Sequence, residues 1–167
     1  MKNLYHATPY DMTAIGFYFR TYEEYLEKAK THKNKYGDPV EEYEIQFLDG
    51  ENYALFGALS VNQANLKQWF DEFEGLEGNE LVSAIYLAEY LSYNMDDLKD
   101  SLDDVSLFEG TAKEYAYEYI DDTGLLNEMP ENLRFYFDFD AFTRDMIMSG
   151  DITEVTINNT NYIAWGV

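Results

Sequence analysis

The stretch TAKEYAYEYIDDTGLLNEMPENLRFYFDFDAFTRDM, residues 111–146, decides how the C-terminal part of this chain folds. Thr111 and Glu114 have the three-residue spacing of a capping box, in which hydroxyl and carboxylate each accept a hydrogen bond from a free amide at a helix start. We therefore predict a helix that begins near Ala112. Gly124 adopts a left-handed backbone at low steric cost, so it is expected to end this helix.

The predicted helix is amphipathic. Tyr115, Tyr119 and Ile120 fall on one face at three- and four-residue spacing. The opposite face is acidic and is expected to be solvated; it carries Glu114, Glu118, Asp121 and Asp122. Pro130 suits the first turn of the next helical piece, where its missing amide hydrogen is not needed.

Ten residues within this stretch resemble the C-terminal part of the ArdA antirestriction family in order and spacing: Gly124, Pro130, Leu133, Tyr136, Phe137, Asp138, Ala141, Phe142, Arg144 and Asp145. The resemblance implies an acidic mimic of DNA, usually dimeric and carried by mobile genetic elements, that binds type I restriction-modification enzymes in the place of DNA. It also implies motif or dimer roles for Tyr136, Phe137, Asp138, Phe142, Arg144 and Asp145. The N-terminal segment YDMTAIGFYF departs from the family's Tyr-Asn-x-Gly opening.

Composition indicates a folded chain with an aromatic core, because 46% of the residues are hydrophobic and 16 Tyr, 11 Phe and 2 Trp are present. The absence of cysteine excludes disulfides, thiol catalysis and zinc fingers. No secretory signal and no apolar run of ~20 residues is apparent, so we expect a soluble cytoplasmic protein.

The net charge of −22 is unevenly distributed. Residues 1–50 hold nine acids and six bases, whereas residues 51–167 hold 24 acids and five bases. Self-repulsion at this level destabilises a folded chain, so solubility or a basic partner must account for it.

We predict an elongated α+β protein with three small units, the first of which covers residues 1–58. Strand composition at 14–19 is followed by a capping box at Thr21 and Glu24, and alternation over 43–47 indicates a half-buried strand. The segment 53–58 is interpreted as a returning strand. The helix after Thr21 is expected to bury one stripe and to end near Gly37; the stripe consists of Tyr22, Tyr25, Leu26 and Ala29. Lysines at 28, 30, 33 and 35 suit the negative end of this helix dipole; a nucleic-acid patch is the alternative.

Short helices are predicted over residues 59–108, and helices with a β-hairpin over 109–167. A third capping box at Ser60 and Gln63 precedes a buried face that consists of Leu66, Trp69, Phe70 and Phe73. Asn79 and Asn94 are expected to cap two further helices. The hairpin turns at Asn158 and Asn159, which tolerate left-handed conformations.

Carboxylates gather on these predicted helices and their connections. The fifteen candidates for a DNA-mimic surface are Asp71, Glu72, Glu74, Glu77, Glu80, Asp96, Asp97, Asp100, Asp103, Asp104, Glu109, Glu114, Glu118, Asp121 and Asp122, opposed only by Lys99 and Lys113. Solvated helices usually mix charge signs, so this bias favours a basic partner over mere solubility. An acidic module that binds another basic or DNA-binding protein is the alternative.

Other functions find less support. Neither MDDLKDSLDD nor YIDDTGLLNEMPE keeps the order of an EF-hand, and His6 and His32 are the only histidines, so no metal or other cofactor is predicted. His6 is expected at the surface or a strand edge, and His32 at a helix end. No pair of carboxylates stands out for catalysis and no phosphate loop or nucleophile elbow occurs, so we predict no enzyme.

The sequence also supports expectations for two arginines and one aromatic run in the C-terminal part. Arg134 and Arg144 are expected to pair with nearby carboxylates among Asp138, Asp140 and Asp145. The aromatic run exceeds what one face of a short helix hides, so part of it is expected to reach a partner subunit; its members are Phe135, Tyr136, Phe137, Phe139 and Phe142.

Overall fold

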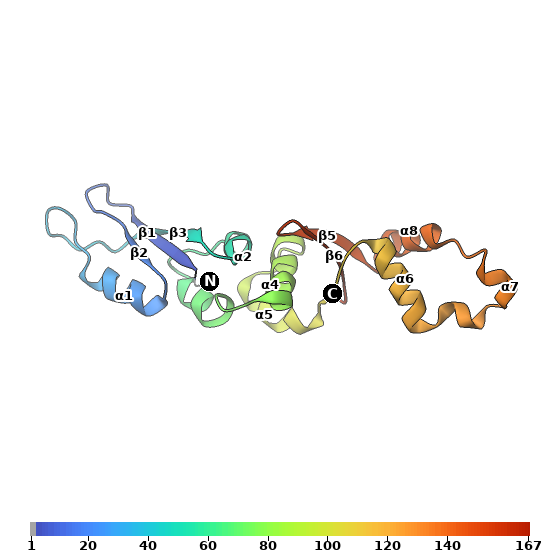
Figure 1. Cartoon of the computed structure of the whole chain (residues 1–167). Coiled ribbons are helices and arrows are strands. Elements are labelled where there is room, and N and C mark those ends of the chain that lie inside the picture. The colour runs from blue at the N-terminus through green and yellow to red at the C-terminus, as the bar shows by residue number, and fades with distance from the viewer. Residues whose placement is uncertain (1–2) are drawn as a thin grey trace. The chain divides into compact units, whose positions relative to one another are not determined.

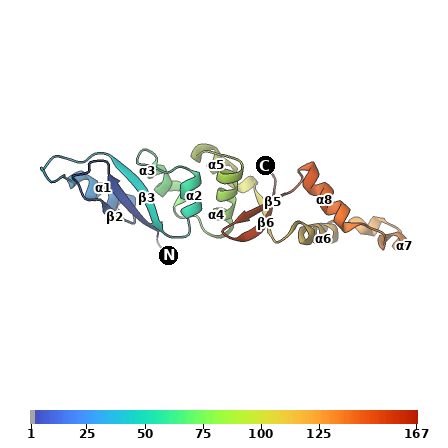
Figure 2. The ribbon, with the colours of Figure 1, turned by 90° about the horizontal axis from the view of Figure 1, so that it is seen from above.

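The computed structural model describes residues 3–167 and confirms the α+β class (Figures 1 and 2). Contacts divide the chain into an N-terminal unit, Met1–Asp100, and a C-terminal unit, Ser101–Val167. Each unit contains one antiparallel three-stranded sheet. The finer division at residues 58 and 108 stays a prediction.

The N-terminal sheet has the order β2-β1-β3 and is built from β1 (Leu4–Pro9), β2 (Phe17–Phe19) and β3 (Tyr43–Asp49). Tyr43, Ile45 and Phe47 are buried while their neighbours in β3 are exposed, which confirms the predicted alternation. Helix α1 (Tyr22–Thr31) lies beside this sheet (Figure 2). It packs on the sheet through Tyr25, whose ring centroid lies 5.2 Å from that of Phe19.

Short helices complete the N-terminal unit: α2 (Tyr53–Ala58), α3 (Leu66–Gln68), α4 (Gly78–Ile85) and α5 (Met95–Ser101). Wider π-helical turns extend α3 over Trp69–Phe73 and α4 over Tyr86–Tyr90. The predicted strand at 53–58 is wrong. Leu55, Phe56 and Leu59 have helical spacing and are all buried, so a helix hides more apolar surface than a strand would.

The C-terminal unit begins with a single 3-10 turn (Leu102–Asp104) and holds a sheet of order β4-β6-β5 and three helices. Its strands are β4 (Ser106–Glu109), β5 (Thr153–Ile157) and β6 (Thr160–Trp165), and its helices are α6 (Ala112–Thr123), α7 (Glu131–Arg134) and α8 (Phe139–Ser149). A further 3-10 turn (Leu125–Glu128) follows α6. The β5–β6 hairpin turns at Asn158 and Asn159, both left-handed as predicted. Strand β4 was not predicted.

The helix ends test the predicted caps. The Thr111–Glu114 capping box is present, and Gly124 ends α6 with φ 64°. Asn94 accepts from the amides of Asp96 and Asp97 and so caps α5 as predicted. Thr21 caps α1, but the Glu24 carboxylate accepts from the Arg20 amide, so that box is incomplete.

Four other details of the prediction are wrong. Ser60 lies outside any helix with φ 50°, and the Gln63 side chain instead bonds the backbone at 41 and 43. Asn79 lies inside α4, which Glu77 precedes. Helix α1 ends at Thr31, so Lys33 and Lys35 lie beyond it, and Leu26 is 48% exposed rather than buried.

Candidate acidic interaction surface

The predicted acidic residues lie at the surface of both units. All fifteen side chains are exposed except those of Glu72 and Glu74, which are half-buried. Glu89, which the prediction omitted, is also exposed, on the π-helical turn after α4. Glu89 is separated from the other acidic residues in the sequence, so no local pattern indicated it.

The densest acidic row of the N-terminal unit follows α5. It consists of Asp96, Asp97 and Asp100, while Met95 and Leu98 of the same helix are buried. Asp103 and Asp104, in the 3-10 turn of the C-terminal unit, are exposed as well. The three carboxylates of α5 lie within about 6 Å of helix axis, or about one per 2–3 Å. Duplex DNA presents about one phosphate per 1.7 Å of axis and one per 3.4 Å of a single strand, so the row approaches the charge density of a strand.

A second row follows α6, where Glu114, Glu118, Asp121 and Asp122 are exposed. Glu114 also completes the capping box: its carboxylate accepts from the Thr111 amide at 2.8 Å, a bond that lowers the pKa of Glu114. Part of the predicted surface therefore has a structural role.

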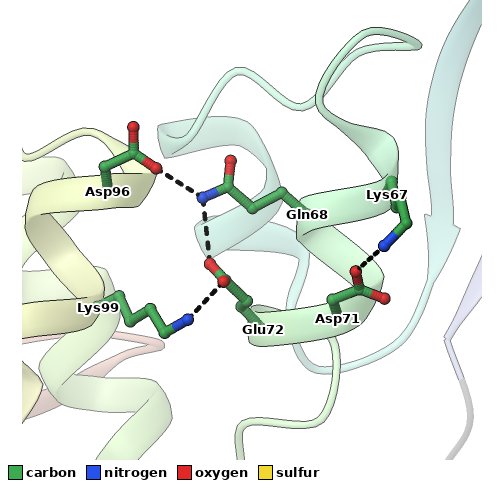
Figure 3. A network of polar contacts seen from close by, with 6 residues as sticks. All are labelled: Lys67, Gln68, Asp71, Glu72, Asp96 and Lys99. Carbon is green, nitrogen blue, oxygen red and sulfur yellow. Dashed lines mark hydrogen bonds and ion pairs between the residues drawn. The ribbon is translucent and has the colours of Figure 1, made fainter.

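A polar network fixes the π-helical turn of α3 against α5 (Figure 3). Lys99 donates to Glu72 at 2.6 Å, and Gln68 donates to Glu72 at 3.1 Å and to Asp96 at 2.8 Å. The hydrogen bond from Lys99, helped by Gln68, lowers the pKa of Glu72, and the same contact raises the pKa of Lys99. Lys99, the basic residue on α5, is thus bound to Glu72 rather than placed among the carboxylates of the α5 row.

Other bases in the acidic part of the chain are also engaged. Lys67 pairs with Asp71 one turn along its helix, and Lys113 reaches Asp140 at 2.7 Å. In the described part of the chain, residues 3–167, no ion pair engages Asp100, Asp103 or Asp104. These carboxylates are therefore available to an outside partner.

The two arginines behave differently from each other. Arg144 lies 3.8 Å from Asp145 with both side chains exposed, as predicted, which is a weak surface pair. The predicted pairing of Arg134 is wrong: its guanidinium donates to the carbonyls of Met129 and Asn127, both at 3.1 Å. These two hydrogen bonds close the loop before α7.

The motif residues of the C-terminal unit divide into packed and exposed groups. Asp138 caps α8 by accepting from the Ala141 amide, and the half-buried rings of Phe137 and Phe142 pack 5.5 Å apart. Phe135 and Tyr136 are 92% and 81% exposed. The aromatic run thus covers the core only in part.

The histidines have local roles. His6 lies in β1, the central strand of its sheet, and not at a sheet edge. Its ring packs against Tyr18, and its Nδ1 forms a hydrogen bond with the Thr8 hydroxyl at 2.8 Å. His32 caps the end of α1 and stacks on Tyr43, with hydrogen bonds to the Tyr43 hydroxyl and the Ile15 carbonyl.

Residues 3–167 contain no group of three or more His, Cys, Asp or Glu arranged to hold a metal ion. Within the same range, every helix is too short or too polar to cross a membrane.

The family model described as antirestriction protein (ArdA) matches residues 10–160, which includes the divergent N-terminal segment as well as residues 111–146. No curated protein matches the chain.

Proposed function

The chain belongs to the ArdA family of antirestriction proteins, and from this premise we propose that it blocks restriction by replacing duplex DNA in the binding groove of a type I restriction-modification enzyme. The observation that carries the proposal is the acidic row on α5, where exposed carboxylates recur at about the spacing of strand phosphates. The lysines and arginines that the enzyme uses for phosphates would then bind these carboxylates. The function needs no catalytic residue and no cofactor.

A competition assay tests this proposal. The purified protein should displace labelled duplex DNA from a type I enzyme at near-stoichiometric amounts, and displacement should weaken as salt rises, because paired charges are screened. Failure to displace DNA at any salt concentration would contradict the proposal and favour another basic partner.

A pair of charge variants locates the effect. We choose Asp100, Asp103 and Asp104 because no ion pair within residues 3–167 engages them, and replace all three by Lys. The control replaces three exposed acids of the N-terminal unit by Lys, namely Glu23, Glu41 and Glu42, and so changes the net charge equally. Inhibition should collapse only in the first variant; an equal loss in both would indicate general electrostatic attraction rather than a placed mimic.

We further propose that the protein acts as a homodimer joined through the exposed rings of Phe135 and Tyr136. The two rings lie next to each other, with centroids 6.2 Å apart, and so form a contiguous exposed patch of the kind that marks an interaction surface, and the resemblance implies a dimer. Replacing both by Ser should yield monomers in analytical ultracentrifugation. The control replaces Met12 and Tyr36, which are 98% and 71% exposed, and should leave the dimer intact; a wild-type monomer would contradict the proposal.

A further inference from the structure

The C-terminal unit contains a pocket that the acidic rows alone do not explain. It is a cavity of about 460 Å³ at the C-terminal half of α6, and its lining includes Tyr117, Glu118, Ile120, Asp121, Asn127 and Phe139. Ile120 is buried beneath it. The pocket therefore combines an apolar floor, two aromatic rings and two carboxylates.

One wall of the pocket is held in place by a contact between two of its own residues and by an ion pair beside it. The rings of Tyr117 and Phe139 stack with centroids 4.3 Å apart and an interplanar angle of 27°. One turn before Tyr117, Lys113 reaches from α6 to Asp140 at 2.7 Å and ties the two helices together. A ligand would thus meet a wall that is already ordered.

The 3-10 turn after α6 also lines the pocket. Gly124, with φ 64°, turns the chain back toward the helix, and the Asn127 amide donates to the Gly124 carbonyl at 2.8 Å. Arg134 donates to the Asn127 carbonyl at 3.1 Å and closes this loop from behind. The guanidinium of Arg134 therefore binds backbone carbonyls and does not pair with the carboxylates of the pocket.

The chemistry of the lining selects a planar cation. Glu118 and Asp121 are exposed, three residues apart on one face of α6, and no ion pair engages either within residues 3–167. A guanidinium group stacks on aromatic faces and forms paired hydrogen bonds with a carboxylate, whereas an ammonium group is compact and strongly hydrated. Arginine fits this lining better than lysine.

We propose that this pocket receives an arginine side chain of the partner protein. The inference rests on the proposed function and sharpens it: one residue of the enzyme's phosphate-binding set is held at a defined point, while the acidic rows act collectively.

Direct titration tests the pocket without any enzyme. N-acetylarginine methylamide should cause saturable NMR shifts of the Gly124 and Asn127 amides, at about tenfold lower concentration than N-acetyllysine methylamide. The variants Tyr117→Leu and Asp121→Asn should each weaken this binding severalfold. The second variant leaves the ring stack intact, so a folding defect in the first would not decide the outcome. Equal shifts with both compounds, or none, would overturn the proposal.

The competition assay then shows whether the pocket is used. Tyr117→Leu should displace DNA about tenfold less effectively than the wild type. The control is Tyr53→Leu, because Tyr53 is also exposed and also lies against a phenylalanine, Phe47, at 5.8 Å. If Tyr117→Leu displaces DNA as effectively as the wild type, the proposal that the enzyme's arginine occupies this pocket is overturned. Failure of the wild-type protein to displace DNA would instead contradict the proposed function, and the titration would still judge the pocket.

Discussion

The two units carry the same net charge but have cores built from side chains of different size. Nineteen acids oppose eight bases in residues 1–100, and fourteen oppose three in residues 101–167, so each part carries a net −11. The N-terminal core is made of large rings, with Trp69, Tyr5, Phe19 and Phe73 almost fully buried. The C-terminal core is centred on smaller side chains, Ala112, Ala116, Met146, Ile152 and Ile163, and its rings are only partly buried.

The difference shows where each unit can use its aromatic residues. The N-terminal unit exposes some tyrosines, such as Tyr36 and Tyr53, but it also buries several rings almost fully, and this burial offsets the repulsion between its carboxylates. The C-terminal unit has 67 residues for the same charge, and none of the rings in its described residues, 101–167, is fully buried, so each keeps some surface for contacts with other molecules. We therefore expect it to be the less stable unit. Each unit holds one tryptophan, Trp69 or Trp165, so fluorescence can follow them separately.

The largest effect is expected from Trp69→Ala, since this ring is fully buried and packs edge-on against Phe56. Removing it should lower the free energy of unfolding of the N-terminal unit by about 3–5 kcal/mol. Urea unfolding followed by circular dichroism measures the loss, while Trp165 fluorescence should keep its midpoint. A Trp165 midpoint that moves equally would show that the two cores unfold together and would break the comparison.

A smaller effect is expected from Ala116→Leu in the C-terminal core. Ala116 is fully buried beside Ile152 and Ile163, so a larger side chain must displace its neighbours, at a cost of about 1–3 kcal/mol. Trp165 fluorescence reports this unit because the Trp165 ring lies 4.7 Å from that of Tyr115. No loss of stability would mean that the small-residue core has spare room.

Tyr5→Phe tests a single buried hydrogen bond in the N-terminal core. Trp69 Nε1 donates to the Tyr5 hydroxyl at 2.9 Å, and the variant leaves that buried donor without its partner, which costs about 1–2 kcal/mol. Trp69 fluorescence during unfolding measures the change. In a double-mutant cycle with Trp69→Phe, followed by circular dichroism because that variant lacks the Trp69 signal, the cost of the double variant should be smaller than the sum of the two single costs, because both polar groups are removed together.

The smallest effect concerns pH. Because Lys99 lowers the pKa of Glu72 in the folded state, the pair stabilises the N-terminal unit above the ordinary glutamate pKa of 4.5. That contribution is lost as pH falls through the lowered pKa. The stability advantage of the wild type over Glu72→Gln should be small near pH 7, since Lys99 is largely exposed, and should shrink below pH 4.5. An advantage that grows in acid would contradict this sign.

Local signals in the sequence predicted local structure. The Thr111–Glu114 box, Gly124 and the Asn158–Asn159 turn each act within a few residues, and all three formed as expected. The exposure of the acidic rows follows from the same helical periodicity.

What depends on distant partners was not predictable in the same way. Strand β4 has only four residues and exists because β6, about fifty positions later, pairs with it. The segment 53–58 was misread because its composition suits either structure, although the spacing of Leu55, Phe56 and Leu59 favours a helix. The pocket joins Tyr117 and Phe139 from two helices, and no pattern in one segment reveals such a meeting.

The order of strands in the C-terminal sheet determines how early that sheet can form while the chain is being synthesised. Strand β6 is the centre of that sheet, and it is translated after both of its neighbours. At about 5–20 residues per second, β4 waits about 3–10 s for its partner. During that interval its backbone donors and acceptors remain without the ladder that later satisfies them. The N-terminal sheet, whose strands are complete by Asp49, is finished long before, so the newborn chain carries one assembled sheet while the other awaits its central strand.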